Sequence, residues 1–193
     1  PRNLELPPRV AGGLARAAGL DLSRPFVVHV ADVDGWSNAE QALAVLHAAQ
    51  DAGAQDLALV IVAMLPAGDP RAWRTLGELS DLTAGLDEVV VVPDVGGAGD
   101  AEVNAIQRLA RVAIAAHEDT TTAEAQWKTT PAVTGDELAD PTARGARVAE
   151  LVADPGLAIE LGRAGRERVR SEQLVTRLLA DQLELYARIT SAA

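Results

Sequence analysis

Hydrophobic residues occur along the chain in short continuous runs, and longer segments with one apolar face separate these runs. Three of the runs, at residues 25–30, 57–62 and 89–92, are rich in β-branched side chains. Continuous runs of this length predict strands that are covered on both faces, because a half-exposed strand alternates apolar and polar residues. Residues 111–115 and 132–133 predict a fourth and a fifth strand.

The segments between the runs predict helices. Residues 37–52 have one apolar face and a potential cap at Ser37 or Asn38, whose side chains accept hydrogen bonds from free backbone amides. A second helix is predicted to start with Asp69 as its cap and Pro70 in its first turn. Its core-facing residues are expected to be Trp73, Leu76 and Leu79. Further helices are predicted at 101–110, 120–128, 142–153, 155–170 and 171–189.

This alternation predicts an α/β fold with a doubly wound parallel sheet, because right-handed crossovers place successive helices on its two faces. The 193 residues suffice for one Rossmann-like domain. We expect a lead-in linker and helix at 1–24, a β/α core at 25–141 and C-terminal helices at 142–193. Ligands bind such folds at the carboxyl ends of the strands. The candidate loops are therefore 31–37, 63–70, 93–101, 116–122 and 134–142.

Composition and charge exclude several classes of function. The net charge of −11 opposes the phosphate backbone of nucleic acid, which is therefore not an expected partner. The chain has no cysteine and three scattered histidines, so no metal site is expected. It shows neither a signal peptide nor an apolar run of about eighteen residues, so we expect a soluble, cytoplasmic protein without contact to a membrane. Because the chain starts at Pro1 and not at methionine, we expect it to be a piece of a longer protein.

Two segments carry a recognisable pattern. Residues 102–108 read E-V-N-A-I-Q-R, and residues 124–128 read E-A-Q-W-K. Residues 69–73 (D-P-R-A-W), residues 3–6 (N-L-E-L) and the tail from 148 to 179 add to it. Together these segments resemble the C-terminal domain of retaining GT-B glycosyltransferases (glycosyl transferases group 1) of the trehalose synthase and trehalose phosphorylase type. The resemblance covers nearly the whole chain.

This resemblance implies a domain that holds a nucleotide-sugar donor, such as UDP- or ADP-glucose, and needs no further cofactor. Such a domain would serve a retaining hexosyltransferase that transfers a glucosyl unit. The remaining catalytic groups would come from an N-terminal Rossmann domain, so the 193 residues alone are expected to be inactive, with no catalytic residue of their own.

The resemblance implies that Glu124 binds the donor ribose, because the family has there the second carboxylate of a conserved pair. A carboxylate can accept hydrogen bonds from two hydroxyls. The alternative is a glutamate that only complements the helix dipole. Glu118 matches the first carboxylate, but five residues separate the pair here and seven do so in the family. The loop also lacks the family's glycines, and Thr120, Thr121 and Thr122 either obstruct the phosphates or cap the next helix.

Other positions of the expected donor site are altered. Asp32 and Ser37 stand where the family has the arginine and lysine that neutralise the donor diphosphate, so the local charge is reversed. Gly135 is the remaining glycine of a later glycine-rich loop. Trp36 either stacks on a sugar or base or fills the core, and His117 lies at the end of a strand in the candidate region.

Two functions therefore remain open from the sequence. The first is the donor-binding half of an active glycosyltransferase. The second is a non-catalytic descendant that acts as a binding, assembly or regulatory module, which the lost cations and glycines favour. The partner in either case is an N-terminal domain or a second copy of the chain. The expected contact residues are Leu174, Leu178, Leu179, Leu183 and Tyr186.

Overall fold

The computed structural model describes residues 2–32, 36–66, 68–95, 99–116, 120–135 and 138–172, together with residues 179, 182, 183 and 189. In these residues five parallel strands form one sheet in the order β3-β2-β1-β4-β5. The strands are β1 (Phe26–Asp32), β2 (Ala58–Leu65), β3 (Val89–Val95), β4 (Val112–Ala115) and β5 (Ala132–Thr134). The helices are α1 (Pro8–Ala17), α2 (Trp36–Asp51), α3 (Pro70–Leu82), α4 (Asp100–Leu109), α5 (Thr120–Trp127), α6 (Pro141–Ala153) and α7 (Pro155–Glu172).

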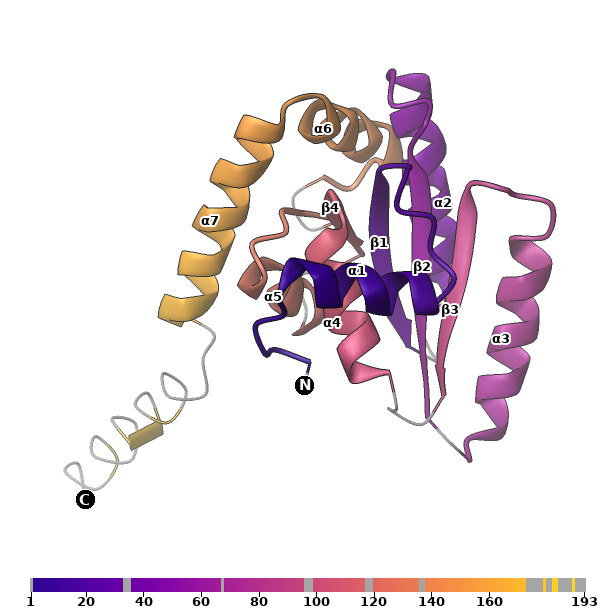
Figure 1. The fold of residues 1–193 in the computed structure, drawn as a ribbon, viewed down its shortest axis with the longest axis horizontal. Coiled ribbons are helices and arrows are strands. Elements are labelled where there is room, and N and C mark those ends of the chain that lie inside the picture. The colour runs from indigo at the N-terminus through magenta and orange to yellow at the C-terminus, as the bar shows by residue number, and fades with distance from the viewer. Residues whose placement is uncertain are drawn as a thin grey trace.

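Helices cover both faces of the sheet, and each face has its own apolar core. The side chains of α2, α3 and α6 pack on one face, against residues such as Val27, Leu59 and Ile114. The side chains of α1, α4 and α5 pack on the other face, against residues such as Val28 and Val60. Figure 1 shows α1 crossing in front of the sheet and α3 standing beside the edge strand β3. The predicted doubly wound α/β fold is therefore confirmed.

The order of the strands reverses between β1 and β4. From β1 the chain builds outward through β2 to β3, and it then crosses to the other side of β1 for β4 and β5. After β1 the chain crosses to β2 on one side, and after β4 it crosses to β5 on the other side. The loops at the carboxyl ends of β1 and β4 therefore lead away from each other. A crevice between such loops is the usual ligand site of this fold.

The predicted strands and helices agree with the observed ones, apart from shifts of a few residues at their ends. Asp69 caps α3 as expected, because its side chain accepts a hydrogen bond from the amide of Arg71 at 2.9 Å, and Pro70 follows in the first turn. The predicted helix over 171–189 lies mostly outside the described residues. None of the described helices is long and apolar enough to cross a membrane.

The prediction that Trp73 faces the core is wrong, since 67% of this residue is exposed. The buried positions of α3 are Ala72, Thr75 and Leu79, which follow the i, i+3, i+7 spacing of one helical stripe. Trp73 lies just outside this stripe. Because α3 covers only the edge of the sheet, a narrow stripe is all that it buries.

Helix α7 packs on α5 beyond the edge strand β5, and in Figure 1 it extends away from the sheet. The guanidinium of Arg166 lies 5.0 Å from the centre of the Trp127 ring, which is within the range of a cation–π interaction. A glycine at 162 is required at this contact, because a Cβ there would collide with the carbonyl oxygen of Thr129.

Candidate functional site

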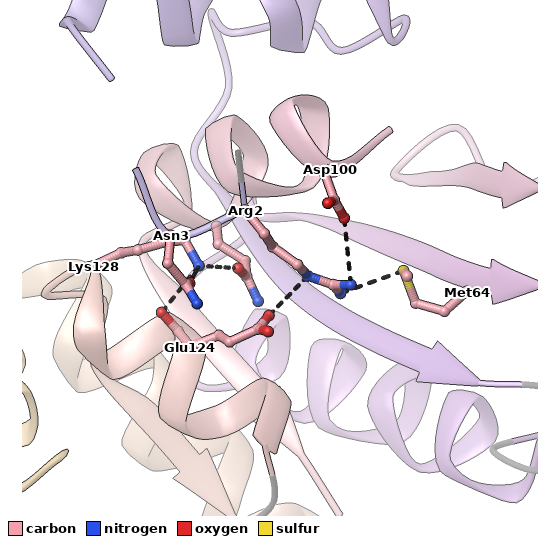
Figure 2. A network of polar contacts seen from close by, with 7 residues as sticks. Arg2, Asn3, Met64, Asp100, Glu124 and Lys128 are labelled. Carbon is pink, nitrogen blue, oxygen red and sulfur yellow. Dashed lines mark hydrogen bonds and ion pairs between the residues drawn. The ribbon is translucent and has the colours of Figure 1, made fainter. Parts of the chain in front are cut away.

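The candidate site lies at the carboxyl edge of the sheet, where β1 ends at Asp32 and β4 ends at Ala115. Helix α5 begins at Thr120, shortly after β4, and carries the predicted ligand residue Glu124 on its second turn. Arg2 belongs to the N-terminal segment that precedes α1 in the sequence, and its side chain reaches this edge of the sheet. Figure 2 shows its side chain between Glu124 and residues from β2 and α4.

Glu124 forms an ion pair with Arg2, in which Nε of Arg2 lies 2.9 Å from Oε2 of Glu124. Both atoms are fully buried. The arginine is held further by the Oδ1 of Asp100 at 3.8 Å from Nη1 and by a hydrogen bond from Nη2 to the sulfur of Met64 at 3.4 Å. The other oxygen of Glu124, Oε1, has no hydrogen-bond partner among the described residues, and 16% of the side chain is exposed.

One helical turn after Glu124, Lys128 is buried with 3% of the residue exposed. Its ammonium group donates to three oxygens, namely Oε1 of Gln107 at 2.7 Å, Oδ1 of Asn3 at 3.1 Å and the carbonyl oxygen of Glu124 at 3.2 Å. An ammonium group has three hydrogens, so each of them has an acceptor. Lys128 thereby joins α4, α5 and the N-terminal segment.

Burial lowers the pKa of Lys128 to about 8, because removing the ammonium group from water disfavours its charged form. The carboxylate of Glu124 acts in the opposite direction and raises this pKa, whereas Arg108 and Arg2 lower it further. The cluster therefore contains a lysine that loses its proton at a much lower pH than an exposed lysine does.

The backbone of Leu4 is hydrogen-bonded to side chains of α4. The carbonyl oxygen of Leu4 accepts hydrogen bonds from Nδ2 of Asn104 at 2.8 Å and from Nη2 of Arg108 at 2.9 Å. Arg108 also donates through Nε to Oδ1 of Asn104 at 2.9 Å, which is a contact between side chains four residues apart on one helix. Most of the polar residues of the two diagnostic segments thus bind residues 2–4 rather than facing an open cleft.

Sequence reasoning missed this role of the diagnostic segments. It identified the segments at 102–108, 124–128 and 3–6 as marks of one family but not as contacts of one another. A signal was present, since Asn104 and Arg108 are four residues apart, as are Glu124 and Lys128. Such pairs place polar groups on one side of each helix.

The structure describes the side-chain surroundings of only part of the predicted site. Trp36 and Ser37 lie in the first turn of α2 and Asp32 ends β1, but their side chains lie outside the described residues. His117 and Glu118 lie outside them altogether, as do the side chains of Thr120 and Thr121. Thr122 is described and buried, with 1% of the residue exposed.

Gly135 follows β5 and lies against the end of β4. Its amide is 3.2 Å from the carbonyl oxygen of Ala115 and 3.1 Å from that of Ala116. A Cβ at this position would collide with the Ala116 oxygen, so close contact between the two strand ends requires glycine here. The structure therefore gives a steric reason for this glycine, and a ligand contact at Gly135 stays a prediction.

Among the described residues, no three His, Asp or Glu side chains are grouped so that they could hold a metal ion. A pocket of about 280 Å³ is lined by residues of α5, β5, α6 and α7. Its lining includes Gln126, Pro131 and Arg168, and Arg168 donates to Oε1 of Gln126 at 3.1 Å. Neither Glu124 nor Gly135 lines this pocket.

Comparisons with known proteins agree with the resemblance found in the sequence. No family model matches the chain. The chain is 30% identical to trehalose synthase from Rubrobacter xylanophilus, in a match that covers 98% of the chain. It spans about half the length of this curated relative, since the match covers 50% of it.

Solved structures show the same fold. Sucrose-phosphate synthase from Thermosynechococcus elongatus superposes with a TM-score of 0.65 at 19% identity, over 94% of this chain and 49% of that one. The C-terminal domain of a group 1 family glycosyl transferase from Francisella tularensis gives a TM-score of 0.59 at 12% identity, over 89% of this chain and 100% of that one. The second match is to a C-terminal domain alone, which agrees with the half-length match to trehalose synthase.

Proposed function

We propose that this chain, which has the fold of a GT-B glycosyltransferase C-terminal domain, is the donor-binding half of a two-domain enzyme that transfers a glucosyl unit with retention. The proposal rests on the position of Glu124, whose carboxylate stands on α5 directly after β4, at the edge where the strand order reverses. The half-length match to a trehalose synthase supports a missing partner domain. The chain alone is then inactive and still binds the nucleotide.

The geometry of Glu124 suits a ribose. Arg2 holds Oε2 in the interior and so fixes the orientation of the carboxylate, while Oε1 is left without a partner among the described residues. A carboxylate oxygen can accept hydrogen bonds from the neighbouring hydroxyls of a ribose. Arg2 is a positioning residue in this proposal, because it acts on the ligand through Glu124.

The test is binding of UDP, ADP, UDP-glucose and ADP-glucose, measured by calorimetry and by the shift in melting temperature. A hydrogen bond to a charged group contributes about 1.5–3 kcal/mol, so Glu124→Gln should weaken binding of the nucleotide about tenfold or more. Glutamine keeps the shape of the side chain and removes its charge. Glu160→Gln is the matched control, since Glu160 is exposed on α7 and should leave affinity unchanged.

The second candidate is a non-catalytic binding or assembly module. It is favoured by the ion pair itself, because Arg2 already occupies one oxygen of Glu124, and by Asp32 and Ser37 at positions where the family has cations. In that case none of the four ligands stabilises the protein at millimolar concentration, and Glu124→Gln affects only the stability of the fold. This outcome would refute the donor-binding proposal.

A further inference from the structure

A second arginine, Arg144, is buried without an ionic partner. It lies in the second turn of α6 with 2% of the residue exposed. Its Nη2 donates to Oε1 of Gln41 at 3.3 Å. The other two guanidinium nitrogens, Nε and Nη1, are buried and have no hydrogen-bond partner among the described residues.

Burying the positive charge of Arg144 is unfavourable unless an anion pairs with it. A guanidinium group stays protonated in proteins, so it cannot relieve its burial by losing a proton. Burial lowers the pKa of Arg144, and the carboxylate of Asp140 opposes this shift without forming an ion pair among the described contacts. A buried cation with two unused nitrogens predicts an anionic partner.

The surroundings of Arg144 place it at the carboxyl edge of the sheet. Gln41 belongs to α2, which follows β1, and Gly135 follows β5. A Cβ built on Gly135 would lie 3.6 Å from Nη1 of Arg144, and its other neighbour is the carbonyl of Ala116, which follows β4. The guanidinium therefore faces the place where the chain leaves β4 and β5, on the edge that binds ligands in this fold.

We infer that Arg144 is the cation of an anion-binding site at this edge and that its ligand is a phosphate group, specifically the diphosphate of a nucleotide donor. The assignment to a donor rests on the proposed function, whereas binding of phosphate does not. A guanidinium group presents several N–H groups in a planar fork that matches two phosphate oxygens. Arg144 would supply from α6 the positive charge that the chain lacks at Asp32 and Ser37.

Access to the site requires a local change, because the side chain of Arg144 is closed off from solvent. An anion can reach Nε and Nη1 only when the chain around them opens. In return, hydrogen bonds formed there are shielded from water, which strengthens them.

The test uses pyrophosphate and ADP as probes with the protein and with Arg144→Met, and it measures the melting temperature and the dissociation constant. Pyrophosphate should stabilise the protein in a saturable manner, and Arg144→Met should lower its affinity about tenfold or more, since charge-assisted hydrogen bonds are lost. The variant should be no less stable than the parent without ligand, because it loses the hydrogen bond to Gln41 and the attraction to Asp140 but no longer buries a charge. Arg144→Lys is the second variant, which keeps the charge and loses the fork, and it should also bind more weakly.

Arg147→Met is the matched control, because Arg147 lies on the same helix and is paired with Glu150. It should leave the affinity for pyrophosphate unchanged. The inference is overturned if pyrophosphate gives no shift, or if Arg144→Met binds it as tightly as the parent protein does. ADP binding that depends on Glu124 and not on Arg144 would also overturn it, while the proposed function would stand. Pyrophosphate binding that depends on Arg144, without any nucleotide binding that depends on Glu124, would support the anion site and refute the donor.

Discussion

Raising the pH above 8 should stabilise this protein, through Lys128. In the folded protein burial lowers the pKa of this lysine to about 8, against 10.5 for an exposed lysine. Between these two values the unfolded chain binds one proton that the folded chain has lost. The free energy of unfolding therefore rises with pH in this window, and below pH 8 both states are protonated and Lys128 adds no pH dependence.

The size of the effect follows from the difference between the two pKa values. One pKa unit corresponds to about 1.4 kcal/mol, so the full window contributes about 3 kcal/mol to the free energy of unfolding. Solvent screening does not reduce this figure much, because only 3% of Lys128 is exposed. The same amount is what the folded protein loses at neutral pH by keeping this charge inside.

Urea unfolding between pH 7 and pH 10.5 can measure the effect, with Lys128→Met as the reference protein. The chain suits this assay, because it has one lysine, one tyrosine and no cysteine, so few other groups titrate in the window. The difference between the parent and the methionine variant removes the contributions of the tyrosine and the N-terminus. The single lysine can also be followed directly by the 13C resonance of its Cε.

Two results would refute the reasoning about Lys128. One is a lysine resonance that titrates near 10.5, the value of an exposed lysine. The other is a pair of stability curves, for the parent and for Lys128→Met, that run parallel across the window. Either would mean that the contacts of the ammonium group outweigh its burial.

Two further predictions concern packing, and urea unfolding measures both. Gly162→Ala should lower the free energy of unfolding by about 1–3 kcal/mol, because the added methyl group collides with the carbonyl of Thr129; an unchanged midpoint would contradict the close contact between α7 and the residues that follow α5. Trp73→Gln should change stability by less than about 0.5 kcal/mol, whereas Leu79→Ala should cost about 2–5 kcal/mol, because the tryptophan is exposed and the leucine is buried. Equal losses in these two variants would show that α3 faces the sheet differently.

The fold could be predicted from local patterns, because strands buried on both faces leave continuous apolar runs and the segments between them have helical periodicity. The runs at 25–30, 57–62 and 89–92 correspond to three neighbouring strands of the sheet. Trp73 shows the limit of this reasoning. Its hydrophobic character suggested burial, but the width of the sheet edge under α3 decides which residues are covered, and that width is a property of the whole fold.

The candidate site was less predictable, because its contacts join segments that are far apart in the sequence. Glu124 could be singled out from the resemblance, yet its ion-pair partner Arg2 is separated from it in the sequence by almost the whole lead-in segment and β/α core. Arg144 carries no sequence signal at all, since an arginine in the second turn of an amphipathic helix is usually exposed. Its unpaired burial is visible only when α2, α6 and the end of β5 are brought together.

Residues 2–4 precede the first helix and lie mostly at the surface, yet their polar groups bind buried groups of α4 and α5, and this affects how the domain should be cut out for separate study. A fragment that starts at Pro8 would look complete by its helices and strands. It would leave Lys128 without its Asn3 acceptor and the buried oxygen of Glu124 without its cation. Weak nucleotide binding by such a fragment would then reflect the choice of boundary, and exchanges of this domain between related enzymes should carry these residues together with α4 and α5.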